Sequence, residues 1–158
     1  MLIPMKVDYG VRTLVYLAMR PEGTFSSTAA ISAARHVPEP YLLHICSELQ
    51  KAGMIESRRG PQGGHRLTRE PSQISVADIV NSLDYSLAPL DCVDDADECQ
   101  LSGTCAQREM WTDVEQILLK HLDSVSVAEL AAKEELASRV PVKTEFQADA
   151  GRLSQHLY

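Results

Sequence analysis

The 158-residue chain has no hydrophobic run that approaches the ~20 apolar residues needed for a membrane-spanning helix. Its first ten residues, MLIPMKVDYG, lack the apolar segment of a secretory signal. No internal repeat is visible, and the P-loop, GxSxG and HExxH patterns of common active sites are absent. We therefore expect a cytoplasmic protein without a membrane partner, which is not an enzyme. Its length suits one domain with small appendages.

Charge is distributed unevenly along the chain, whose formal net charge is −7. Residues 1–72 carry nine Lys and Arg against six Asp and Glu, a balance of +3. Residues 73–158 carry six against sixteen, a balance of −10. The first half can therefore face a polyanion such as DNA, whereas the second half is repelled from it.

Two short helices are predicted at the start of the basic half. Apolar residues recur at helical spacing over 6–19, which places Asp8 and Arg12 one turn apart on another face. A second helix is expected at 28–35, capped by Ser26 or Ser27. The residues expected to face inward on this second helix are Ala30, Ile31 and Ala34.

A third helix is predicted over 40–53, because Pro40 suits a helix start and Gly53 suits a helix end. Its apolar stripe is expected to be buried and consists of Leu42, Ile45, Cys46 and Leu49. We interpret Cys46 as a packing residue, because free cysteine is often buried.

A β-hairpin follows in MIESRRGPQGGHRLT, residues 54–68, with a glycine-rich turn and arginines at its base. Three short helices and a basic hairpin predict a mainly α, winged helix–turn–helix domain over residues 1–84. The third helix would enter the major groove and the wing would contact the backbone or minor groove. The expected DNA-binding residues are Ser26, Thr28, Pro40, Tyr41, His44, Ser47, Lys51, Arg58, Arg59, Gly60 and His65. A winged helix that binds protein is the alternative.

A short helix over 74–84, capped by Ser75 with Asp78 three residues on, precedes a cysteine-rich loop, residues 85–105. The loop contains CVDDADECQLSGTC, whose Asp, Gly and Ser content argues against helix or strand. Stable disulfides are rare in the cytoplasm, so these thiols are better interpreted as ligands or redox groups.

The C-terminal part predicts a long helix over 106–123 and a short one over 124–136, where Ser126 and Glu129 are spaced as a capping box. We assign residues 106–137 to dimerisation, because the long helix has little of its own domain to pack against. The alternative is that it folds back on the first helix. Residues 138–158 are expected to form a flexible tail. The apolar stripe of the long helix consists of Met110, Val114, Ile117, Leu118 and Leu122.

The segment ISAARHVPEPYLLHICSELQKAGMIESRRGPQGGHRLTREPSQISVADIV resembles the winged-helix core of the iron–sulfur and redox repressors typified by IscR, NsrR and RirA. The opening KVDYGVRTLVYLA, the clustered cysteines, CAQREMW and VSVAEL fit the same pattern. The resemblance covers roughly residues 5–132.

This resemblance implies an iron–sulfur cluster held by Cys92, Cys99 and Cys105, which is a chemistry that thiolates favour. IscR-like proteins supply a histidine three residues after the last cysteine, where this chain has Arg108. NsrR-like proteins use a carboxylate from the partner subunit's first helix, and Asp8 stands at that place. The resemblance therefore favours a 4Fe–4S cluster over a 2Fe–2S cluster. It places Arg12 and Arg108 next to the ligand residues without making them ligands.

The implied function is that of a homodimeric repressor on a palindromic DNA operator. Damage to the cluster by nitric oxide, oxygen or iron scarcity would change its DNA affinity.

Other interpretations stay open. The cysteines could bind zinc, although paired C-x2–4-C ligands are missing, or form a thiol–disulfide switch. The chain could also be a cluster-independent repressor that senses a small molecule, or an iron–sulfur assembly partner without DNA binding. Asp8 could simply pair with Arg12.

Overall fold

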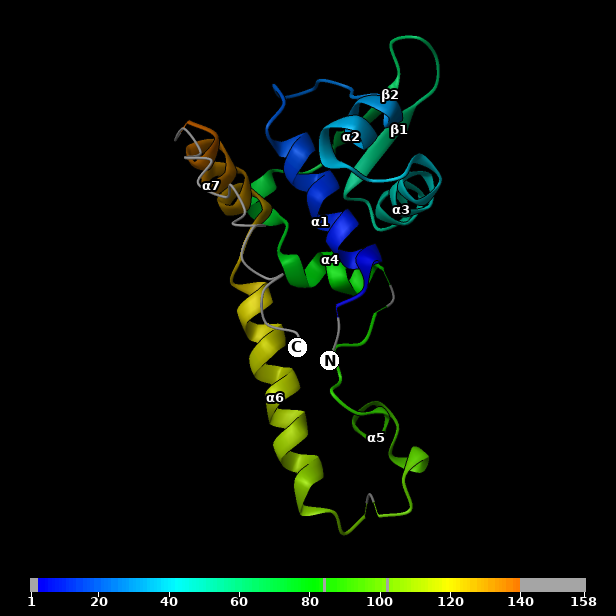
Figure 1. Cartoon of the computed structure of the whole chain (residues 1–158), viewed down its shortest axis with the longest axis vertical. Coiled ribbons are helices and arrows are strands. Elements are labelled where there is room, and N and C mark those ends of the chain that lie inside the picture. The colour runs from blue at the N-terminus through cyan, green and yellow to red at the C-terminus, as the bar shows by residue number, and fades with distance from the viewer. Residues whose placement is uncertain (1–2, 84, 102, 140–158) are drawn as a thin grey trace, which may run out of the picture.

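A computed structural model of the chain describes residues 3–83, 85–101 and 103–139. Three helices and a hairpin occupy one end of the molecule, and a long helix extends from the other end (Figure 1). The elements of the first part are α1 Met5–Ala18, α2 Thr28–Arg35, α3 Glu39–Lys51, β1 Ile55–Arg58 and β2 Gly64–Leu67. The remaining elements are η1 Pro71–Gln73, α4 Val76–Ser82, α5 Asp91–Asp94, η2 Ala96–Glu98, α6 Ala106–Asp123 and α7 Val127–Arg139.

The core lies between α1, α3 and α4, with contributions from α2 and β1. Each large aliphatic side chain removed from water there contributes roughly 1.5–3 kcal/mol of hydrophobic stabilisation. Gly10 of α1 lets α4 approach, since a Cβ at this position would lie 2.8 Å from Cδ1 of Leu83. The large, fully buried side chains include Leu14, Ile31, Leu42, Ile45, Leu49, Ile55, Ile74, Ile79 and Leu83.

The first three helices lie close to their predicted ranges. Ser27 caps α2, because its Oγ accepts a hydrogen bond from the Ala30 amide at 3.1 Å. Ile31 faces inward as predicted, but Ala30 and Ala34 are exposed, so that part of the prediction is wrong. An eight-residue helix buries a narrow stripe here, and alanines are small enough to stay in water without a large cost.

The predicted stripe of α3 is confirmed, since Leu42, Ile45, Cys46 and Leu49 are its buried residues. The helix begins one residue before Pro40, and Gly53 lies just beyond its C-terminal cap with φ +69°. That left-handed conformation favours glycine and ends the helix there. β1 and β2 then pair antiparallel as the predicted wing.

The start of α4 is joined to the turn before α7. Ser75 and Asp78 form the predicted capping box at α4. The Val76 amide donates to the Val125 carbonyl, and the Val127 amide donates to the Ile74 carbonyl, both at 2.9 Å. These backbone hydrogen bonds fix where α7 begins relative to the winged domain.

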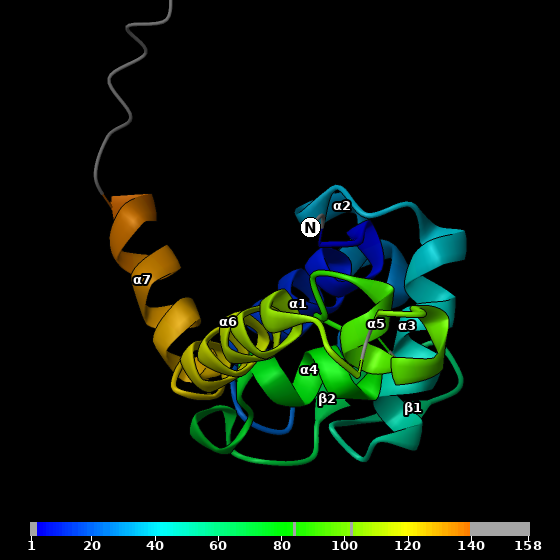
Figure 2. The ribbon, with the colours of Figure 1, turned by 90° about the horizontal axis from the view of Figure 1, so that it is seen from below.

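The long helix α6 packs on α4 and α5, while α7 packs on α1. Figure 2 shows α7 along the outer side of the helical group. The alternative that residues 106–123 fold back on the first helix is therefore wrong, because α7 occupies that position. Among the described residues, no helix is both long enough and apolar enough to cross a membrane. Residues 140–158 of the predicted tail lie outside the described residues.

The cysteine connector contains two short helical turns, α5 and η2. The prediction that this stretch holds no helix is therefore wrong. Its aspartates explain the difference, because short polar side chains stabilise single turns by bonding nearby amides. Asp95 does so with the Asp97 amide at 2.9 Å.

Candidate nucleic-acid interface and cysteine connector

The outward face of α3 presents polar and aromatic side chains to solvent. Tyr41, His44, Ser47 and Lys51 are exposed, as is Pro40 in the first turn. Leu43 is also exposed on this helix, at 57%, although the sequence did not single it out. An outward leucine on a helix of this kind is suited to contact a thymine methyl group.

One of these side chains packs against α1, and a second is linked to α1 through Glu48 of α3. The ring of Tyr41 packs edge-on against Tyr9, with centroids 6.4 Å apart. His44 Nε2 lies 3.2 Å from Glu48, which pairs with Lys6 at 2.8 Å. The position of the α3 surface is therefore coupled to α1.

The wing presents its cations on the β1 side of the turn. Arg58, Arg59 and Gly60 are exposed, and Gly60 has φ +109°. Arg66 on β2 instead pairs with Glu56, lies over the Phe25 ring and donates to the Gly23 carbonyl at 3.2 Å. Arg58 and Arg59 thus have the exposure that phosphate contacts need, whereas Arg66 braces the hairpin.

His65 lies inside the base of the wing, with 8% of its surface exposed. Its backbone exchanges two hydrogen bonds with Ser26, which is also buried. The ring lies 3.1 Å from Thr28 Oγ1 through Nε2 and 2.9 Å from Ser57 Oγ through Nδ1. The predicted direct phosphate contact from His65 is therefore corrected, because both ring nitrogens are already engaged. Ser26 likewise joins the wing to α2.

Sequence reasoning missed Ser57. The observed hairpin register pairs Ser57 with His65 across the two strands. Counting outward from the GPQGG turn would have placed Arg59 opposite His65 instead, so the partner follows only from the structure.

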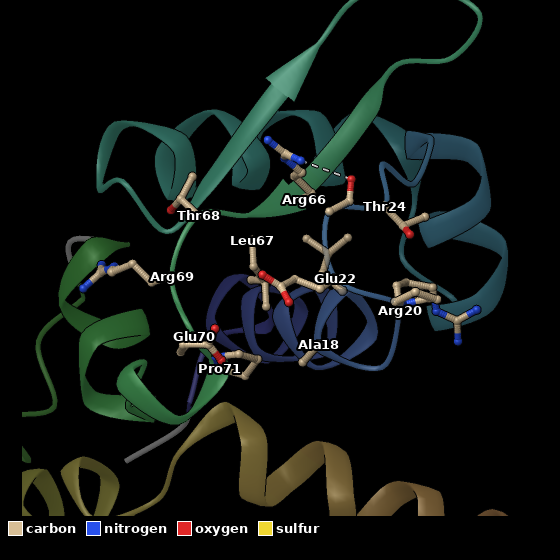
Figure 3. A pocket seen from close by; sticks show the side chains of 13 residues that line it. Ala18, Arg20, Glu22, Thr24, Arg66, Leu67, Thr68, Arg69, Glu70 and Pro71 are labelled. Carbon is tan, nitrogen blue, oxygen red and sulfur yellow. Dashed lines mark hydrogen bonds between the residues drawn. The ribbon is translucent and has the colours of Figure 1, made fainter.

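A groove of about 350 Å³ separates the end of α1 from β2 and η1 (Figure 3). Arg20, Glu22, Arg69 and Glu70 stand around it. Arg20 stacks on Tyr16, and Arg69 donates to the Ala52 carbonyl at 3.5 Å. The arginines at this groove thus make contacts within the domain itself.

The connector carries three of the four thiols, and all four cysteines are free. Cys92, Cys99 and Cys105 are partly exposed, whereas Cys46 is buried in α3. Burial raises the pKa of the Cys46 thiol to about 12. Cys46 is therefore a packing residue, and the connector thiols are the ones available for chemistry.

Arg108 ties the two ends of the connector together. Its Nε donates to the Cys92 carbonyl at 2.8 Å from the first turn of α6. Cys105 is the N-terminal cap residue of that helix, where the helix dipole favours negative charge such as a thiolate. The first and last connector cysteines are thus linked to one helix end.

Asp8 pairs with Arg12 at 2.7 Å, and both side chains remain substantially exposed. The Arg12 guanidinium also lies over Tyr9 and donates to the Arg35 carbonyl at 3.4 Å. The Asp8 carboxylate is thus positioned by α1 itself and stays accessible from outside the chain.

The donor set fits an iron–sulfur cluster in its chemistry, since three free, partly exposed thiols share one short connector. Within residues 3–83, 85–101 and 103–139, however, no group of three Cys, His, Asp or Glu side chains is arranged to hold a metal ion. The connector must therefore close further if its sulfurs are to share one cofactor.

Residues 3–133 match the Rrf2 family, which is described as an iron-dependent transcriptional regulator. An HTH-type transcriptional regulator of Synechocystis is 32% identical over 130 residues, which cover 82% of this chain and 87% of that protein. The similarity thus extends over both the winged domain and the connector.

Two solved structures share the fold over most of their length. IscR of T. potens has a TM-score of 0.72 and 30% identity, covering 89% of this chain and 93% of that one. CymR of B. subtilis, named the global cysteine regulator, has a TM-score of 0.69 and 28% identity. The match covers 84% of this chain and 98% of the CymR chain. The winged-helix fold is confirmed by these likenesses.

Proposed function

The chain belongs to the Rrf2 family of transcriptional regulators, and on that premise we propose that it is a homodimeric repressor of a palindromic operator. In this proposal α3 enters the major groove and the wing contacts the phosphate backbone. The observation that carries it is the joint exposure of the outward α3 side chains and of Arg58 and Arg59. Two copies related by a two-fold axis would read the two halves of the operator.

The backbone contact is tested by charge reversal at Arg59. We expect R59E to weaken binding to a duplex selected from a random-sequence pool and to lower the slope of log affinity against log salt by about 1. R139E is the matched control, because it changes net charge equally at an exposed position on α7. Equal salt slopes for R59E and R139E would contradict the backbone contact.

The second part of the proposal concerns the connector. Cys92, Cys99 and Cys105 would hold an iron–sulfur cluster, 4Fe–4S rather than 2Fe–2S, with Asp8 of the partner subunit as the fourth ligand. Support comes from three free thiols in one connector and from the accessible Asp8 carboxylate. When bound, such a cluster supplies a centre that nitric oxide or oxygen attacks and that iron scarcity depletes.

The residues of this chain determine how a change in the connector reaches the DNA. The connector joins α4, which is part of the winged core, to α6, which carries the exposed apolar stripe. Arg108 holds Cys92 at the start of α6. A change in connector conformation would therefore alter where α6, and with it the partner, sits relative to α3. Small displacements break several phosphate contacts together.

The ligand set is tested on protein purified without oxygen. We expect iron, acid-labile sulfide and a visible absorption spectrum in the wild-type protein, and their loss in C99A. D8A should keep the three sulfur ligands, yet lose iron faster on exposure to air or nitric oxide. If D8A loses iron at the same rate as the wild-type protein, Asp8 is not a ligand of the cluster.

A cluster-independent regulator that responds to a small molecule or to thiol oxidation is the second candidate. It is favoured by the absence of a preformed three-ligand group in the described part of the chain. A colourless, iron-free protein that binds its selected duplex with full affinity would support this candidate.

A further inference from the structure

A buried imidazole joins two hydroxyl groups at the junction of the wing and α2. Thr28 is the first residue of α2 and Ser57 lies on β1, and His65 on β2 bonds both hydroxyls. Ser57 is exposed and Thr28 is partly exposed, whereas the histidine is 8% exposed. Thr28 and Ser57 therefore lie at the surface, while the ring that bonds their hydroxyls does not.

The wing is locked against α2 at this point. Ser26 and His65 exchange backbone hydrogen bonds at 2.9 and 2.8 Å. A Cβ on Gly64 would lie 2.1 Å from the Ser26 carbonyl oxygen, so only glycine permits this approach. The backbone of His65 is thus held beside the start of α2 by the fold.

The protonation state of the ring determines how many hydroxyl protons are free. A neutral imidazole donates through one nitrogen and accepts through the other. One hydroxyl must then donate its proton to the ring, and only the other can donate outward. A protonated imidazole donates through both nitrogens, so both hydroxyls can donate their own protons outward.

We propose that His65 is a positioning residue that presents the hydroxyls of Thr28 and Ser57 as outward donors to the DNA phosphate backbone, and that DNA binding is coupled to protonation of its ring. This inference rests on the proposed DNA-binding function. The first turn of α2 contains no acidic residue, and its dipole favours an anion. Phosphate is the anion that duplex DNA offers at regular spacing.

The charged groups on the elements around His65 are mostly paired with one another. The imidazole ring is therefore the group that we expect to titrate here. Glu56 on β1 and Arg66 on β2 pair with each other, and Arg35 at the far end of α2 pairs with Glu134. Arg58 is exposed beside the hairpin turn. In the free protein, burial lowers the pKa of His65 below its ordinary value of 6.5.

The free protein and the DNA complex should therefore respond to acid in opposite directions. Because the pKa of His65 is lower in the folded chain than in the unfolded chain, the unfolded chain binds more protons as pH falls below about 6.5. Acid then lowers stability. A bound phosphate raises the pKa of the ring, so the complex binds more protons than the free protein, and acid strengthens binding.

The experiment measures duplex affinity of the full-length, oxygen-protected protein from pH 8 to pH 6, using the duplex selected from the random-sequence pool. Relative to H65Q, the wild-type protein should tighten by about threefold on acidification to pH 6, because one unit of pKa shift on binding reaches its full tenfold effect only below both pKa values. H121Q is the matched control, because His121 is exposed on α6, far from the wing. It should retain the wild-type pH dependence. His44 is present in all three proteins.

A second pair of variants tests the hydroxyls while leaving the ring in place. T28V and S57A should each weaken binding severalfold and flatten the pH dependence, while their melting temperatures at pH 8 stay near that of the wild-type protein. These variants decide the question if H65Q does not fold. Equal pH dependence in wild-type, T28V and S57A proteins would overturn the proposal and leave His65 a structural tether. Failure of the wild-type protein to bind any duplex would overturn the DNA-binding function as well.

Discussion

At the scale of single residues, the four cysteines fall into two chemical classes. Cys46 was assigned to packing from its place on an apolar stripe, and its burial confirms that assignment. The connector cysteines were assigned from their crowding in a polar segment, and they are partly exposed. Their role as ligands remains a prediction.

We predict that an alkylating reagent modifies Cys92, Cys99 and Cys105 in iron-free protein and spares Cys46. The thiolate is the reactive species, and burial raises the pKa of Cys46 to about 12. Mass spectrometry of peptides from native and denatured samples would measure this. Labelling of Cys46 at the same rate as Cys105 under native conditions would refute the packing assignment.

Glycine has two separate roles in the wing. Gly60 and Gly64 both have positive φ, but only a Cβ at Gly64 would meet other backbone atoms within 4 Å. We expect G60A to cost about 1–2 kcal/mol in the free energy of unfolding, from backbone strain alone. G64A should cost about 1–3 kcal/mol more, because the Ser26 carbonyl must move. Chemical denaturation measures the free energy of unfolding of both variants. Equal losses of stability in G60A and G64A would contradict the close approach of Gly64 to the Ser26 carbonyl.

At the scale of elements, local signals predicted the helices well and their packing partners poorly. The ranges 28–35 and 106–123 match α2 and α6, because capping serines and long apolar periodicity mark them. The turn α5 has four residues, which is too short for periodicity to reveal. The packing of α7 on α1 depends on residues far apart in sequence, so no local pattern could indicate it.

The site was predictable in the same uneven way. The outward residues of α3 follow from helical spacing, whereas the burial of His65 depends on a cross-strand partner and on α2. A polar residue beside a glycine-rich turn has the same sequence signature whether it faces DNA or bonds two hydroxyls. Only the hairpin register distinguishes these possibilities.

The long helix α6 offers an apolar surface that the described residues of its own chain leave open. Ile117 is 69% exposed, and Met110 and Val114 lie on the same side of the helix one and two turns earlier. We predict that I117E shifts the protein from dimer to monomer without lowering the stability of the winged domain. Q116E is the matched control, since Gln116 is an exposed neighbour that gains the same charge. Sedimentation equilibrium measures the oligomeric state of both variants. A dimeric I117E protein would exclude this stripe from the interface.

At the scale of the whole molecule, charge and architecture divide the protein into two functional parts. Residues 1–72 carry a basic excess of +3, whereas residues 73–158, which include the connector and the C-terminal helices, carry an acidic excess of −10. This division keeps the acidic part away from DNA while the connector joins it to the core. The proposed control of DNA binding from the connector would therefore require the complete chain.

The most direct test of connector control is a comparison of DNA affinity before and after removal of iron from one oxygen-protected preparation. Iron and acid-labile sulfide are quantified in the same samples. The proposal predicts stoichiometric iron in the first sample and a large change in affinity for the selected duplex in the second. Iron-free material from the outset, with unchanged recognition of that duplex, would contradict it.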